Sequence, residues 1–145
     1  MNTESYSPAP QLAGLLPSHD DINSLIDSCG GRDDPKNLSL EHAIRRLAAG
    51  IINNPNDAER WYDMACAFGL MEMSQWKYLF VAHRIDPENT RYMEALAWAF
   101  YRMGDRKQAI ALVNKAIAAV GKDEGRLSLI ESRMMMDKQF DTAIV

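Results

Sequence analysis

No apolar run in the 145-residue chain approaches the roughly 18 residues that a membrane-spanning helix needs. The first ten residues, MNTESYSPAP, lack a basic segment leading into an apolar core, so we expect no secretory signal. Cysteine is scarce. Cys29 and Cys66 lie far apart and outside any CxxC pattern, which is typical of free thiols in a reducing compartment. These absences predict a cytoplasmic protein without membrane insertion.

Basic residues are fewer than acidic ones. The 16 lysines and arginines face 20 aspartates and glutamates, which gives a net charge of −4. A protein that binds the phosphate backbone of a nucleic acid has, as a rule, the opposite balance. We therefore expect no nucleic-acid partner.

Motifs that carry catalysis or hold a cofactor are also missing. His19, His42 and His83 lie on different predicted helices without metal-ligand spacing, so we expect each to be a surface or hydrogen-bonded side chain. No glycine-rich phosphate loop, GxSxG, HExxH or EF-hand pattern occurs. Capping and solvation explain the paired aspartates at 20–21 and 33–34. The sequence predicts a non-enzymatic protein with no catalytic residues, no metal and no cofactor.

Apolar residues recur at helical spacing along most of the chain. One such stripe runs from Ile22 to Cys29 at i, i+3, i+4 and i+7, after a capping Ser18. Pro55 and Pro87 end later helices, because proline lacks an amide donor and disfavours helix at the residue before it. No convincing strand occurs, which predicts an all-α protein. The predicted helices cover residues 19–29, 39–52, 57–68, 74–84, 89–102, 105–119 and 123–138, with GRDDPKN as a polar loop.

The length suits one domain. Residues 1–17, rich in Ser, Pro and Gln around LAGLL, predict a mobile N-terminal arm. Residues 18–145 predict a single helical domain.

Two helices form a unit that repeats. The stretches IINNPND and HRIDPEN place Pro55 and Pro87 32 residues apart, and Gly121 ends a helix 34 residues after Pro87. A period near 34 with two helices per unit is that of a helix-turn-helix solenoid. The glycine in ALAWAFYRMGDRKQAIALVNKAI is then a turn between two helices, and this stretch resembles the tetratricopeptide repeat (TPR) family. Its matching residues are Leu96, Ala97, Phe100, Gly104, Ala109, Val113 and Ala116.

Other parts of the chain match the family in part. Residues 57–88 resemble a further unit, two residues short and with Gln75 or Lys77 where the family has alanine. Residues 39–55 resemble a second helix alone, and residues 123–138 a first helix alone. The resemblance implies a helix-turn-helix solenoid of about three TPR-like units, the first and last incomplete, with an extra N-terminal helix.

The resemblance also implies a site. First helices of such repeats line a concave groove that suits extended or helical peptides. Lys and Asn residues that grip a C-terminal carboxylate in some members are replaced here, so that specificity is not expected. The groove positions implied are Tyr62, Cys66, Arg91, Glu94, Trp98, Tyr101, Arg102, Glu131 and Met134, with Glu59, Gly69 and Leu127 beside them.

The sequence also bears on whether Trp98, Trp61 and the methionines at 134–136 are buried or exposed. Trp98 either contacts a partner in the groove or packs as core against a neighbouring repeat. Trp61 stands where the family has a buried aromatic, so we expect it in the core. Residues 134–136 are three consecutive methionines that cannot all face inward on a helix, so at least one should be exposed.

Two functions follow as hypotheses. The first is a cytoplasmic adaptor or chaperone that binds a peptide or protein segment, similar in architecture to small bacterial type III secretion chaperones. The second is a self-associating scaffold subunit, such as a homodimer, paired through solenoid ends or the stripe that begins at Ile22. The LAGLL arm either stays solvated or folds back into the groove.

Overall fold

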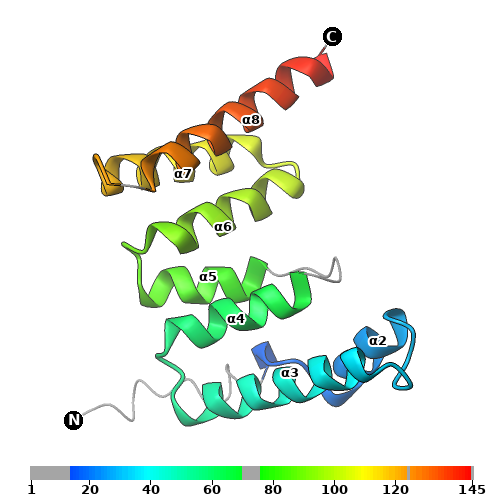
Figure 1. The fold of residues 1–145 in the computed structure, drawn as a ribbon. Coiled ribbons are helices and arrows are strands. Elements are labelled where there is room, and N and C mark those ends of the chain that lie inside the picture. Colours follow the sequence, from blue (N-terminus) through cyan, green and yellow to red (C-terminus); the bar gives the residue numbers. More distant parts are fainter. Residues whose placement is uncertain (1–13, 70–75, 124, 145) are drawn as a thin grey trace, which may run out of the picture. The chain divides into compact units, whose positions relative to one another are not determined.

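The computed structural model describes residues 14–69, 76–123 and 125–144, and all regular structure in this part of the chain is helical. This confirms the all-α prediction. None of the described helices is both long and apolar enough to span a bilayer. The helices are α2 (His19–Ser28), α3 (Pro35–Asn53), α4 (Ala58–Gly69), α5 (Trp76–Ile85), α6 (Thr90–Arg102), α7 (Arg106–Val120) and α8 (Arg126–Ile144) (Figure 1).

The chain divides into two compact units, Met1–Tyr78 (unit 1) and Leu79–Val145 (unit 2), and α5 crosses the division. Residues 1–13 of the predicted arm lie outside the described residues, and so do residues 70–73 of the predicted break at GLMEM. The assignment of residues 18–145 to a single domain stays a prediction.

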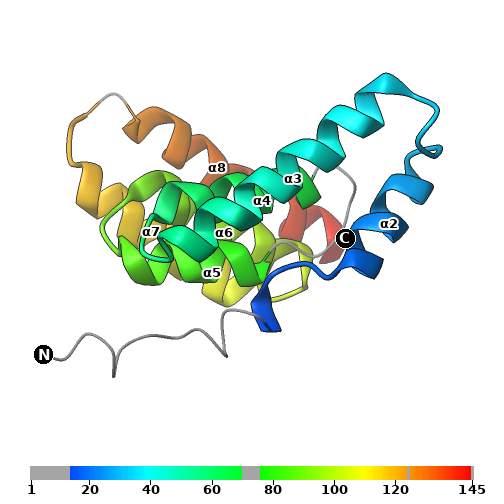
Figure 2. The same ribbon diagram turned by 90° about the horizontal axis from the view of Figure 1, so that it is seen from below.

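The helix α2 of unit 1 begins where the sequence predicts. Ser18 forms a capping box with Asp21: the Ser18 hydroxyl accepts from the Asp21 amide at 3.0 Å, and the Asp21 carboxylate accepts from the Ser18 amide at 2.9 Å. Ile22, Leu25 and Ile26 are buried on the side that packs against α3. Figure 2 shows α2 folded back beside α3.

The next helix, α3, begins at Pro35, four residues before the predicted start, so the last part of GRDDPKN is helix rather than loop. Asp34 makes this possible because its carboxylate accepts the Lys36 amide at 3.0 Å. Pro35 fits the first turn, where its missing amide hydrogen would have no helical partner. The Asn37 side chain then donates to the Gly31 carbonyl at 2.8 Å, which ties the loop to the helix.

A buried carboxylate holds the loop, α2 and α3 together. Glu41 accepts from Arg32 at 2.9 Å and from Arg45 at 3.1 Å, and Arg32 also bonds to Asn23 of α2. The hydrogen bond from Arg32, followed by that from Arg45, lowers the pKa of Glu41 below its ordinary value.

Aromatic side chains pack together in the unit 1 core. Trp61 is 1% exposed, as expected of a core residue, and its indole N–H donates to the Pro55 carbonyl at 2.9 Å. The ring of Tyr78 lies 6.4 Å from that of Trp61 and 5.8 Å from that of Phe68. Burial, with a smaller effect of the Asp21 carboxylate, raises the pKa of Tyr78 to about 12.

Unit 2 is built on the pair α6 and α7. Gly104 has φ of +90°, a conformation that glycine adopts without steric cost, and the Asp105 carboxylate caps α7 by accepting the Gln108 amide. The GD dipeptide is therefore a turn between two helices, as predicted. Ala97 of α6 and Ala109 of α7 are fully buried together with Val113. Such small residues let two helix backbones approach closely.

The last helix, α8, packs against both α7 and α6. Met136 joins the cluster of Ala97 and Ala109, while Leu129 packs with Met93 and Ala116. It runs from Arg126 to Ile144, so it starts later and ends later than the predicted residues 123–138. The Arg126 guanidinium donates to the Gly121 carbonyl at 2.6 Å, which satisfies a backbone acceptor at the end of α7.

The helix α5 deviates from its expected apolar pattern. Leu79 and Ala82 are buried, whereas Trp76 and Phe80 are each 42% exposed. Two aromatic side chains on this helix are thus left in contact with solvent.

Candidate functional site

The predicted groove residues fall in both units. Tyr62 (half-buried) and Cys66 (exposed) belong to α4 of unit 1. Gly69 ends the same helix, and Glu59 lies exposed in its first turn. The other predicted positions belong to α6 and α8 of unit 2, and the contacts below join these two helices.

A chain of hydrogen bonds joins α6 to α8. The Ser132 hydroxyl donates to the Glu94 carboxylate at 2.6 Å, and the Trp98 indole N–H donates to the Ser132 oxygen at 3.3 Å. Ser128, one turn earlier, lies 3.5 Å from the same Glu94 oxygen. Ser132 is itself buried. The chain fixes the side chains of Glu94 and Trp98, which come from successive turns of α6.

Trp98 packs against the core, which is one of the two roles that the sequence left open; its contact with a partner stays a prediction. Its ring packs against the buried cluster of Ala97, Ala109 and Met136, yet the residue remains half-buried. Tyr101 lies against it edge to face, with ring centroids 5.4 Å apart and planes at 84°. The pair is held in one geometry and keeps part of its surface accessible.

Exposed side chains lie on the same two helices. Arg91 and Arg102 lie exposed on α6, and Glu131 and Met134 lie exposed one turn apart on α8. Met134 and Met135 are 63% and 52% exposed, while Met136 is fully buried, which confirms the expectation that at least one of the three is exposed. We call this surface the α6–α8 face; it comprises Arg91, Glu94, Trp98, Tyr101, Arg102, Ser128, Glu131, Ser132 and Met134.

Sequence reasoning missed the two serines of this face. Ser128 and Ser132 are four residues apart and therefore lie on one side of α8, next to the buried Leu129 and Met136. The sequence signal for them was two hydroxyl residues next to the apolar stripe of this helix. Their partner Glu94 is 34 and 38 residues away in sequence, beyond the reach of local spacing.

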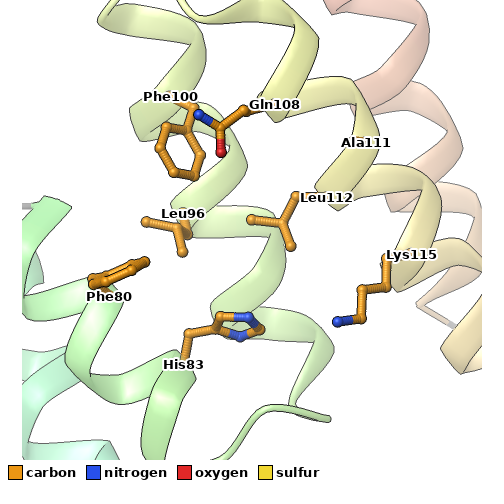
Figure 3. A pocket seen from close by; sticks show the side chains of 8 residues that line it. All are labelled: Phe80, His83, Leu96, Phe100, Gln108, Ala111, Leu112 and Lys115. Carbon is orange, nitrogen blue, oxygen red and sulfur yellow. The ribbon is translucent and has the colours of Figure 1, made fainter.

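A pocket of about 280 Å³ opens elsewhere in unit 2 (Figure 3). Three helices line it, and we call it the α5–α7 pocket. Its lining residues are Phe80 and His83 of α5, Leu96 and Phe100 of α6, and Gln108, Ala111, Leu112 and Lys115 of α7. Figure 3 shows the Lys115 side chain extended toward the His83 ring at one end, with Phe100 and Gln108 at the other.

The environment of His83 differs from expectation. Its Nδ1 atom is buried and has no hydrogen-bond partner, so His83 is neither an exposed nor a satisfied histidine. Burial, followed by the nearby charge of Lys115, lowers the pKa of His83 below its ordinary 6.5. The other two histidines behave as predicted: His42 is exposed, and His19 contacts Arg45 at 3.1 Å.

Metal-ligating side chains do not gather in the described residues: no group of three or more His, Cys, Asp or Glu there could hold a metal ion. Cys29 and Cys66 are free thiols. No protein-family model, no curated protein and no solved structure matches the chain. A functional assignment therefore rests on the geometry of its own residues.

Replacing Ser132 with alanine should lower the free energy of unfolding by about 1 kcal/mol, because Glu94 and Trp98 both lose a hydrogen-bond partner. Urea unfolding measures the change. Ser128→Ala is the matched control: this serine is exposed and lies farther from Glu94, so its effect should stay within about 0.5 kcal/mol. Equal effects of the two substitutions would contradict the role given to the Ser132 hydrogen bonds.

The lowered pKa of His83 gives a pH dependence of stability. Between the folded pKa and 6.5 the unfolded state binds more protons, so stability should fall as the pH drops through 6.5 and below. His83→Gln should reduce this fall in thermal midpoints measured from pH 8 to pH 5, and His42→Gln, at an exposed site, should leave it unchanged. A wild-type pH profile unaffected by His83→Gln would refute the effect.

Proposed function

We propose that the protein is a non-enzymatic, cytoplasmic interaction module that binds a peptide or helical segment of a partner protein on the α6–α8 face. The observation that carries the proposal is the Trp98–Tyr101 pair, which is partly accessible and held edge to face. Arg91, Arg102 and Met134 are exposed on the same two helices. Tryptophan, tyrosine and arginine are the residue types that dominate binding hot spots.

The fixed position of the aromatic pair favours binding. Ordering a side chain at an interface costs roughly 0.5–1.5 kcal/mol. For Trp98 much of this ordering has taken place before a partner binds, because its indole N–H donates a hydrogen bond to Ser132 and its ring packs on the core. A partner segment would therefore meet a surface that needs little rearrangement.

The arrangement of unit 2 supports the TPR-like solenoid. A helical hairpin crosses at alanines, and the following helix packs against both members of the hairpin. In a solenoid of this kind, α6 and α8 are successive first helices, and their shared face is the concave groove. The α6–α8 face is then the place where a repeat protein of this type would hold its ligand.

The residue types on the α6–α8 face indicate which kind of segment it would bind. Two arginines, two carboxylates and a methionine share the α6–α8 face with the aromatic pair, so the bound segment should carry apolar anchors with charges of both signs. Methionine adapts its shape to varied apolar contacts. An adaptor or a chaperone, such as one for a type III secretion protein, would present such a surface. The proposal involves no catalytic residue and no cofactor.

Self-association is the second candidate, and α8 carries it. Leu127, Met134 and Met135 are all more than half exposed on this helix. The stripe at Ile22, Leu25 and Ile26, by contrast, is buried within unit 1, so it cannot serve as the pairing surface in this conformation. A homodimer would use α8 instead.

The test captures the tagged full-length protein from its native cells and quantifies what accompanies it. Trp98→Ala with Tyr101→Ala should reduce a specific companion by at least about tenfold, the scale expected for hot-spot residues. Met134→Glu should also reduce it. Asn114→Glu is the matched control, because it adds the same charge at an exposed position of α7, outside the α6–α8 face.

The outcomes separate the two candidates. If both the double variant and Met134→Glu retain the companion, the companion does not bind at the α6–α8 face. Recovery of the protein alone, as a dimer in light scattering that Met134→Glu dissociates, would favour the scaffold.

A further inference from the structure

The α5–α7 pocket lies apart from the α6–α8 face, on another side of α6. Leu96 and Phe100, one turn apart, line the pocket, whereas Trp98 and Tyr101 belong to the other face. Neither of the proposals above uses this pocket. Three of its features together indicate what it binds.

The first feature is an accessible apolar wall. Phe80 is 42% exposed, Ala111 is exposed, and Leu96, Phe100 and Leu112 lie behind them. At about 280 Å³ the pocket is smaller than the roughly 300–1,000 Å³ of most small-molecule sites. It therefore suits one or two large side chains of a peptide better than a whole cofactor.

The second feature is a one-sided charge. Residues 79–85 of α5 and all of α7 contain no aspartate or glutamate, although the chain as a whole has a net charge of −4. Their cations are Arg84, Arg106, Lys107 and Lys115. Arg106 is paired with Asp137 at 3.5 Å, whereas Lys115 forms no ion pair within the part of the chain that the structure describes.

Two carboxylates in the turns that precede α7 and follow α5 are already engaged. Asp105 accepts from the backbone and the side chain of Gln108, at 3.2 and 2.6 Å. Asp86, in the turn after α5, accepts from the Asn89 side chain at 3.3 Å. Neither neutralises Lys115, so a positive charge stands at one end of an apolar pocket.

The third feature is the buried Nδ1 atom of His83, which has no hydrogen-bond partner in unit 2 or elsewhere in the described residues. A buried polar atom without a partner costs free energy, so this part of the pocket wall is polar and unsatisfied. In Figure 3 the His83 ring and the Lys115 ammonium converge on the same end of the pocket. A polar group of a ligand placed there would lie beside the Lys115 ammonium and the His83 ring.

We propose that the α5–α7 pocket is a second docking site, which takes a large apolar side chain from an acidic peptide segment whose carboxylate pairs with Lys115. The apolar side chain fills the space between Phe80 and Leu112. The carboxylate selects the segment by charge, because a lysine in its place would face Lys115. Such selection acts at short range and weakens as salt rises.

Selection from a displayed library of random peptides, about twelve residues or three helical turns long, tests this on the full-length protein. Enriched peptides should combine Asp or Glu with Leu, Phe or Trp. Lys115→Glu should weaken the best of them about fivefold, the scale of a reversed partly exposed ion pair. Lys107→Glu is the matched control on the same helix: it makes the same change at an exposed residue outside the pocket, and its effect should stay below about twofold.

Peptide-side changes complete the test. Replacing the apolar residue of the best peptide by alanine, or its acidic residues by lysine, should abolish its binding. The proposal is wrong if no peptides are enriched, if they lack an acidic bias, or if the two lysine variants weaken binding equally. A dimer of this chain that Lys115→Glu dissociates, or tighter binding of single-stranded RNA than of any selected peptide, would also overturn it.

Discussion

The close approach of α6 and α7 at Ala97 and Ala109 is the constraint on which unit 2 depends. Both alanines are fully buried, and any larger side chain at the crossing would push the backbones apart. Because the crossing is tight, Met136 of α8 can reach the same cluster. That places Ser132 within hydrogen-bond distance of both Glu94 and Trp98. The α6–α8 face thus follows from the packing of two alanines.

The same helix supplies both proposed surfaces. α6 buries one stripe of side chains against α7 and α8. The side chains on either side of that stripe belong to the two different surfaces. Glu94, Trp98 and Tyr101 lie toward α8, while Leu96 and Phe100 line the α5–α7 pocket. The mixed-charge face and the basic pocket would suit different partner segments.

Local pattern was sufficient for much of this fold. Apolar spacing located the described helices, although α8 ends six residues later than predicted. The glycine of the GD turn, the buried Trp61 and the exposure of at least one methionine in residues 134–136 were expected. The start of α3 was missed because the cap at Asp34 outweighs the polar character of the segment after it. Contacts between distant residues could not be found this way. The bond from Ser132 to Glu94 and the unpartnered His83 arise only when helices far apart in sequence meet.

Hydrogen exchange of the backbone amides, followed by mass spectrometry on the full-length protein, tests the central claim most directly. If the alanine crossing holds α6, α7 and α8 as one cooperative body, residues 93–100, 109–116 and 129–136 should exchange slowly and at a common rate. Ala97→Leu should accelerate all three segments together. Fast exchange in residues 129–136 while the other two segments stay protected would contradict the account. In that case α8 would not be held in place against α6, and the α6–α8 face would not be a fixed surface.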